Sequence, residues 1–266
     1  MDRVVIAAVG LSLLAGAARS QTADPNAAAC KTVITDPNQV DRAVKSLQDK
    51  AAELTSYQAS VVYVTRQPLL DSTALRKGVL YYAKSDGRSK LRIDFVTLQQ
   101  DEEPEQRYVE QFLFDGVLLT TVNHQTKQVE RRQMAEPNEP VDAFSLASRH
   151  MPVLGFSKMD DLRKQFDVAI SADPAEDPAF LHLCLTVRPD SIYKDDYTKI
   201  DFWVDRKIGL PARIHAVTTE EDVHEIQLVE PQVNAGVDDK KFQIDIPKGF
   251  AVENVPLEKK SQQSRQ

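Results

Sequence analysis

The chain has 266 residues, of which 42% are hydrophobic and 27% are charged, and its formal net charge is −7. This composition is that of a globular protein, with either one large all-β domain or two small domains. The negative charge disfavours nucleic acid and anionic membrane surfaces as partners, because both repel an acidic chain at long range.

Residues 1–20 carry the features of a secretory signal peptide. Arg3 precedes an apolar run from Val4 to Leu14, and small residues follow where a signal peptidase would cleave. The run is short for crossing a bilayer, so an uncleaved membrane anchor is the weaker alternative, and no later segment has the length and apolarity of a span. We therefore expect a cleaved signal peptide and an exported, soluble mature protein.

A polar linker is expected at 21–37, and one amphipathic helix follows it. Asp36 or Asn38 can cap the start of this helix. Apolar residues recur along one helical face, and these are Val40, Val44, Leu47, Ala51 and Leu54. The opposite face is charged, so the helix should pack one side against an apolar surface.

Strands are expected to dominate the chain after the helix. Runs at 57–67, 74–84 and 88–98 are rich in β-branched and aromatic residues. In the third run Leu91, Ile93 and Phe95 alternate with charged residues at a period of two, which is typical of a strand with one buried face.

The second half of the chain begins with an insert that contains prolines. Two short helical stretches are expected in it, at 141–147 and 157–166. Strands then resume, and the alternation in KKFQIDIP (240–247) predicts a final strand. The polar end, 259–266, is expected to be a disordered tail.

Residues 109–132 form a predicted hairpin with a tight Asp115-Gly116 turn. Beside the turn the apolar residues are consecutive, at 112–114 and 117–119, so both faces of the hairpin must be covered. The whole pattern predicts about ten antiparallel strands, and a sheet of that size curls. The expected class is α+β, mainly antiparallel β. We expect one domain at 38–258, an unclosed half-barrel with the N-terminal helix and the mid-chain helical insert as its lid.

Two cysteines are present, Cys30 and Cys184. An exported protein can form a disulfide between them, although a single pair gives weak grounds for one. A lipid-anchor role for Cys30 is disfavoured, because a polar segment separates it from the apolar run. Cys184 is equally compatible with a small buried strand residue.

The sequence contains none of the motifs that would indicate an enzyme. His-Glu-x-x-His, Gly-x-Ser-x-Gly and a glycine-rich phosphate loop are all missing from it. His215 and His224 flank the 218–222 turn and could face each other near Glu225, but a metal site needs a further converging ligand. We interpret them as exposed strand histidines, and we expect no catalytic residue, no metal and no cofactor.

Several segments resemble the LolA family of periplasmic carriers of outer-membrane lipoproteins. FDGVLLTTVNHQTKQV (114–129) resembles the family's hairpin, and KGVLYYAK (77–84) resembles its second strand. The end of the predicted helix at 54–64 and the segments 199–217 and 233–252 follow in the family's order. The resemblance runs over about residues 38–253, nearly the whole expected mature chain.

The resemblance implies a periplasmic, monomeric lipid-binding protein that carries acyl chains toward the outer membrane, with membrane donor and acceptor proteins as partners. The alternative is a sensory module of the same fold that acts through a protein partner. If the family's latch position, Lys84 here, points inward, so do Leu80 and Tyr82. The expected lipid-cavity residues are Leu80, Tyr82, Leu91, Ile93, Phe95, Phe112, Phe114, Ile200 and Phe202.

Two further roles follow from the resemblance. Val44, Leu47, Ala51 and Leu54 would form the apolar side of the lid. The family usually has an arginine at the latch position, and Lys84 lacks its planar fork, so the latch should be weaker. The alternative for Lys84 is a solvated lysine at the end of a strand.

Overall fold

The computed structural model describes residue 30 and residues 32–85, 87–143 and 159–257, and the structural statements below refer to these residues. Its strands are β1 (Val33–Ile34), β2 (Ser56–Gln67), β3 (Ser72–Ser85), β4 (Arg88–Gln100), β5 (Gln106–Phe114), β6 (Leu118–Asn123), β7 (Gln128–Gln133), β8 (Phe166–Ser171), β9 (Phe180–Val187), β10 (Tyr197–Asp205), β11 (Leu210–Thr218), β12 (Val223–Val233) and β13 (Ala251–Val255).

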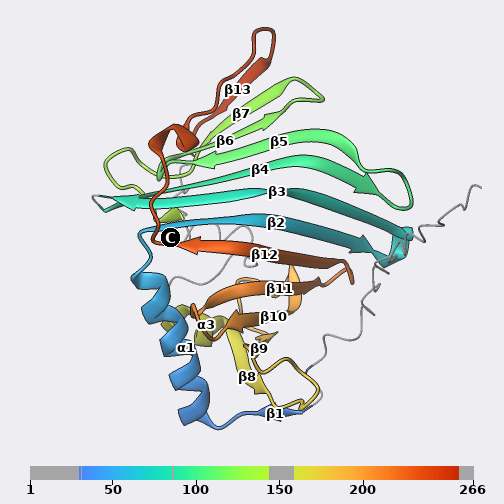
Figure 1. Cartoon of the computed structure of the whole chain (residues 1–266), viewed down its shortest axis with the longest axis vertical. Coiled ribbons are helices and arrows are strands. Elements are labelled where there is room, and N and C mark those ends of the chain that lie inside the picture. The colour runs from blue at the N-terminus through green and yellow to red at the C-terminus, as the bar shows by residue number, and fades with distance from the viewer. Residues whose placement is uncertain (1–29, 31, 86, 144–158, 258–266) are drawn as a thin grey trace, which may run out of the picture.

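These described strands form one sheet in the order β1-β8-β9-β10-β11-β12-β2-β3-β4-β5-β6-β7-β13. Each neighbouring pair is antiparallel except β7 and β13, which run parallel. The sheet is unclosed, with β1 and β13 at its two edges, and helices lie against part of it (Figure 1). The predicted class, an open half-barrel of mainly antiparallel strands with helical parts, is confirmed.

One face of the sheet, called the concave face here, carries the main apolar core. The register places Phe202 opposite Ile214, and Ile214 opposite Ile226. On the other half of the sheet, Leu80 lies opposite Ile93. Because side chains alternate between faces along a strand, these pairings align one apolar row across the sheet.

Helix α1 (Pro37–Ala52) covers the β8–β11 part of the concave face. It begins at Asp36, whose carboxylate accepts a hydrogen bond from the Asn38 N–H, 3.0 Å away. The helix packs against β8, β11 and α3 (Met159–Gln165), as Figure 1 shows, and an Arg163–Asp41 ion pair joins the two helices. Gly209 faces Lys50 so closely that an added Cβ would lie 2.6 Å from the lysine Cγ.

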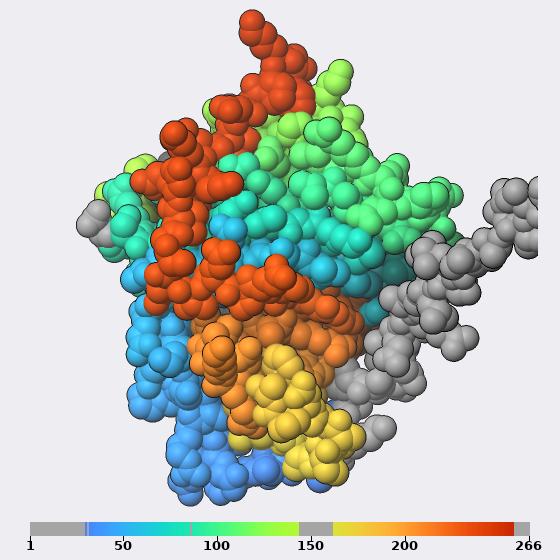
Figure 2. Space-filling view, viewed as in Figure 1, coloured from blue at the N-terminus to red at the C-terminus, as the bar shows by residue number. Residues whose placement is uncertain are grey.

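The C-terminal segment lies across the opposite, convex face of the sheet. The Arg92 guanidinium donates to the carbonyls of Lys241 and Gln243, both at 2.7 Å. Figure 2 shows this segment, in red, over the surface of the strands it crosses. On the convex face of the 109–132 hairpin, Val122 and Val129 are buried, and Leu113 beside the turn is half-buried.

The final strand predicted at 240–247 is wrong. Residues Asp239–Phe242 form a 3₁₀ helix, η3, which begins at Asp238 with the carboxylate accepting from the Lys240 N–H. Arg92 occupies the carbonyls that a partner strand would need. The last strand is instead β13, which begins after Pro247 and after Gly249, whose φ is positive.

Other boundaries differ from the predictions in smaller ways. The end of the expected linker at 21–37 contains β1, which pairs with β8. Within the described residues the helix expected at 157–166 runs over Met159–Gln165, and Phe166 already begins β8. Most of the stretch expected at 141–147, the signal peptide and the tail lie outside the described residues. Within the described residues, no helix has the length and apolarity to cross a bilayer.

Candidate functional site

The residues expected to line a lipid cavity all lie on the concave face. Leu80, Tyr82, Leu91, Ile93, Phe95, Phe114, Ile200 and Phe202 are buried, and Phe112 is half-buried. Phe112 packs edge-on against Phe95, with ring centroids 6.3 Å apart, and Phe95 also contacts Tyr63. Strands far apart in sequence thus contribute to one apolar surface.

Polar atoms on this surface are few. The Tyr57 hydroxyl is buried and has no hydrogen-bond partner among the described residues. Burial raises the pKa of Tyr57, so the hydroxyl stays neutral. The Arg76 Nε, further along the concave face on β3, is likewise buried without a partner in the described part of the chain. The surface can therefore bury apolar groups and offers only isolated polar contacts.

The predicted lid residues lie on or just after α1. Val44 and Leu54 are buried, and Leu47 packs against the core from a half-buried position. Ala51 is half-buried in the last turn. The helix contacts the β8–β11 side of the sheet.

Lys84, the predicted latch, lies exposed near the end of β3. Its backbone N–H donates to the Thr55 carbonyl at 2.8 Å, but its side chain makes no hydrogen bond to any described residue. The polar contact to the insert comes instead from Ser89, directly opposite Lys84. The Ser89 hydroxyl donates to Asp142 Oδ2 at 2.9 Å and accepts from the Ala143 N–H at 2.7 Å. Sequence reasoning missed Ser89, although a serine preceding Leu91 at the period of two was a usable signal.

The convex face of β9–β12 carries a second group of residues. Cys30 and Cys184 form a disulfide there. Around it lies a convex polar cluster of Glu176, His182, Asp201, His215 and Glu225, of which all but Glu176 are buried. Trp203 stacks on His182, with ring centroids 4.2 Å apart, and the Arg213 Cζ lies over the Trp203 ring, 4.5 Å from its centroid.

Hydrogen bonds within this cluster favour the charged forms of His182 and Asp201. Burial opposes protonation of His182, but hydrogen bonds to Asp201 and Glu176 outweigh it and raise the histidine pKa. Burial likewise opposes ionisation of Asp201, yet its bonds to His182 and His215 lower the carboxyl pKa overall. Sequence reasoning missed His182, Asp201 and Glu176, because only the fold brings these side chains together.

The interpretation of His215 and His224 as exposed histidines that could face each other is wrong. His215 lies opposite Glu225, whereas His224 lies opposite Ala216 and therefore on the concave face. His215 is buried, and His224 is half-buried with its Nδ1 2.8 Å from the Tyr63 hydroxyl. His215 and His224 are not cross-strand partners in the observed register, so their rings lie on opposite faces of the sheet.

No protein-family model matches the chain, and no curated protein matches it either. Among solved structures, the chain is similar to MucB, with 12% identity and a TM-score of 0.51 over 79% of this chain and 64% of MucB. It is also similar to the lipoprotein LppX of Mycobacterium tuberculosis, with 11% identity and a TM-score of 0.45 over 76% of this chain and 98% of LppX. A LolA superfamily protein from Nitrosomonas europaea has 15% identity and a TM-score of 0.32 over 75% and 97% of the respective chains.

This chain spans slightly less than two thirds of the MucB chain. At 12% identity, the similarity to MucB shows a shared fold and nothing about activity. The fold-level similarity to MucB agrees with the open half-barrel expected from the sequence, and a LolA superfamily protein is among the structures to which the chain is similar.

Proposed function

We propose that the protein, whose sequence resembles the LolA family, is an exported carrier that holds acyl chains of a lipid or lipoprotein on its concave face. The observation that supports this most directly is the continuous apolar row from β9–β12 across β2 to β5. Acyl chains need no precise polar partner, and each buried methylene contributes about 0.8 kcal/mol.

The energetics allow a useful affinity. A sixteen-carbon acyl chain would gain on the order of 10 kcal/mol from burial before the costs of ordering and association. The half-buried Phe112 is the most accessible of the predicted cavity aromatics, and Tyr57 offers a neutral hydroxyl on the same face. Catalysis is not part of the proposal, and its chemistry requires neither a metal nor a cofactor.

The proposal includes export to the periplasm after removal of residues 1–20, and a monomer that exchanges cargo with membrane donor and acceptor proteins. An N-terminus near Ala18 or Gln21 on the purified protein would support it. Intact Met1–Ser20 on membrane-fixed protein would contradict it.

Binding can be tested with two neighbouring residues of β5 that point to opposite faces. Phe112 is on the concave face and Leu113 on the convex face, and both are half-buried. Phe112→Asp should lower the affinity for a fluorescent fatty acid by about tenfold or more, because a charge would enter an apolar surface. Leu113→Asp is the matched control. Equal affinity in both folded variants would contradict binding on the concave face.

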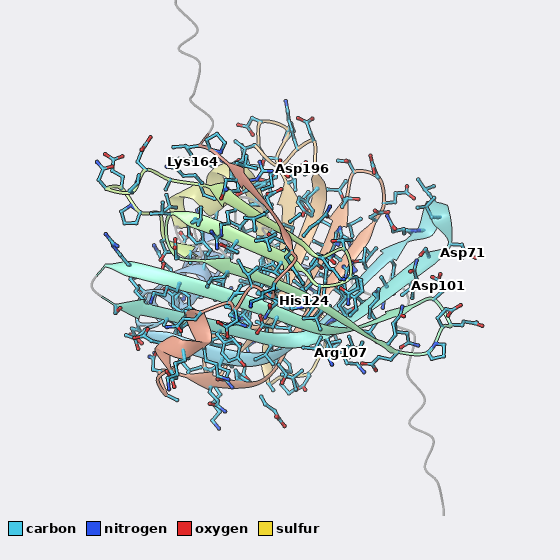
Figure 3. The ribbon with its side chains drawn as sticks, turned by 90° about the horizontal axis from the view of Figure 1, so that it is seen from above. Asp71, Asp101, Arg107, His124, Lys164 and Asp196 are labelled. Carbon is cyan, nitrogen blue, oxygen red and sulfur yellow. A yellow bond between two sulfur atoms is a disulfide. The ribbon has the colours of Figure 1, made fainter. Side chains whose placement is uncertain are left out.

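A second candidate function, a binding module for a protein partner, is favoured by the exposed end of the β2–β3 hairpin. Leu69 and Leu70 lie there in η1 (Pro68–Leu70) and are 78% and 70% exposed. The neighbouring β4–β5 turn reaches the same end, where Asp101 accepts from the Thr73 N–H (Figure 3). Exposed leucines at a hairpin tip are typical of a contact surface. Crosslinking to a partner that Leu69→Ser abolishes, with fatty-acid binding retained, would favour this function.

A further inference from the structure

The disulfide on the convex face has two potential metal ligands in contact with it. His182 and Cys184 are two residues apart on β9, so their side chains emerge on the same face. Asp201 on β10 is the direct cross-strand partner of Cys184. Cys30, which precedes β1, completes the group, and the four ligand atoms lie within 4.8 Å of one another.

Four separations between the ligand atoms are close to the edges of a tetrahedral zinc site, whereas the two sulfurs are bonded to each other. Zn–S bonds of about 2.3 Å and Zn–N or Zn–O bonds of about 2.0–2.1 Å give S–N and S–O edges of about 3.6 Å and an N–O edge of about 3.3 Å. His182 Nε2 lies 3.5 Å from Cys30 Sγ and 3.9 Å from Cys184 Sγ. Asp201 Oδ1 lies 3.7 Å from Cys30 Sγ and 3.4 Å from His182 Nε2.

The surrounding residues orient these ligands as zinc sites require. His182 Nδ1 is 2.6 Å from Glu176 Oε1, which makes Nδ1 the donor and leaves Nε2 directed at the two sulfurs. Glu176 is itself held by the Ser171 hydroxyl at 2.8 Å. A carboxylate behind the ligating imidazole is a common arrangement in zinc proteins, where it fixes the ring.

A disulfide alone does not account for this environment. The Asp201 carboxylate is buried, and its partners are distant: Oδ1 lies 3.4 Å from His182 Nε2, and Oδ2 lies 3.6 Å from His215 Nδ1 and 3.8 Å from Lys199 Nζ. Buried carboxylates normally have close partners, because an unsatisfied charge is costly. A cation bound beside Oδ1 would supply a close partner for this carboxylate.

We propose that, when the disulfide is reduced, the chain binds Zn²⁺ through Cys30 Sγ, Cys184 Sγ, His182 Nε2 and Asp201 Oδ1. A dithiol reductant supplies two electrons and two protons, so the S–S bond breaks, two thiols form and the reductant becomes a disulfide. Zn²⁺ then displaces both thiol protons, which pass to solvent. The sulfurs must separate to about 3.8 Å, and Cys30 belongs to no strand, so its movement leaves the sheet intact.

The test uses the full mature protein in two forms, oxidised and reduced, each freed of reductant without air. Zn²⁺ is titrated in competition with a chromophoric chelator, and Co²⁺ is used separately as a spectroscopic probe. The reduced form should bind one equivalent of Zn²⁺ at least tenfold more tightly than the oxidised form. Its Co²⁺ complex should show thiolate charge transfer and the visible bands of a tetrahedral ion.

Four variants separate a built site from a simple pair of thiols. Asp201→Asn and His182→Gln keep both cysteines and should weaken Zn²⁺ binding to the reduced form at least tenfold. Glu176→Gln should weaken it by about tenfold through loss of ring orientation. His124→Gln is the control, because His124 bonds to Gln111 away from the cluster and should change nothing.

The proposal is overturned if reduced and oxidised protein bind Zn²⁺ equally. It is also overturned if Asp201→Asn and His182→Gln, shown to be folded by circular dichroism, bind as tightly as the parent. Because the readout is metal affinity, it is independent of acyl-chain binding, and failure of either proposal leaves the other standing.

Discussion

The two faces of β9 and β10 contrast sharply although they share the same backbone. On the concave face Leu183, Leu185, Ile200 and Phe202 are buried in the apolar core. On the convex face His182 and Asp201 are equally buried, but among charges and a disulfide. Apolar side chains tolerate many arrangements of similar volume, whereas buried charges need specific partners at specific distances.

The difference shows where each kind of role can be placed. The concave face can accept a ligand that is defined only by being apolar, since its contacts are non-directional. The convex polar cluster depends on cross-strand register, because a one-residue shift would point its side chains to the other face. Substitutions on the concave and convex faces should therefore differ in how they change the stability of the protein.

The largest effect is expected from truncation in the apolar core. Phe202→Ala should lower the free energy of unfolding by about 3–5 kcal/mol, because it removes a fully buried ring and leaves a cavity. Its neighbour Trp203 is half-buried on the convex face, so Trp203→Ala should cost clearly less. Urea denaturation measures the free energy of unfolding of both variants. An equal or larger decrease for Trp203→Ala would contradict the contrast between the two faces.

A smaller and pH-dependent effect is expected from Glu225 in the convex polar cluster. Burial opposes its ionisation, but the Gln227 hydrogen bond and the charges of Arg213 and Arg66 lower the carboxyl pKa overall. Removal of this charge leaves two guanidinium groups without their partner, with His215 as the facing residue on β11. Glu225→Gln should therefore cost about 1–3 kcal/mol at neutral pH.

The sign of the pH dependence follows from the lowered pKa. The stabilisation by Glu225 is fully present above its unfolded pKa of about 4.3 and is lost as the pH falls through the folded value. The destabilisation of Glu225→Gln relative to the parent should hence shrink on acidification below about pH 4. Urea midpoints measured across this range test it, and a difference that grows toward acid would contradict the assignment.

The smallest effect on stability is expected at Lys84, whose substitution is compared with that of Ser89 on the neighbouring strand. The side chain is exposed, so Lys84→Met should change stability by less than about 0.5 kcal/mol. Ser89→Ala, directly opposite, should cost about 1–3 kcal/mol because it leaves the buried Ala143 N–H without its acceptor. Thermal unfolding compares the pair. A larger loss for Lys84→Met, together with faster hydrogen exchange in residues 38–56, would restore Lys84 as the latch.

Much of the fold was readable from the sequence. The β-branched and aromatic run at 57–67 is β2, and the period-two run at 88–98 is β4. The helical stripe at 40–54 is α1 and the two residues that follow it. The prediction failed at 240–247. Apolar and polar residues alternate there as they would in a strand, but the carbonyls of Lys241 and Gln243 accept hydrogen bonds from Arg92 and not from a partner strand. Local pattern does not reveal which partner a backbone carbonyl will find.

The sequence by itself determined the apolar concave face, because burial of alternating side chains depends only on their spacing and hydrophobicity. It also supplied the two cysteines and the order of segments that resembles the LolA family. Only the tertiary structure decided that Cys30 meets Cys184 beside His182 and Asp201, since these contacts join positions 152–171 residues apart through cross-strand register. The same holds for Ser89 and Asp142, 53 residues apart. Polar contacts of this kind require distances and angles that no spacing along the chain specifies.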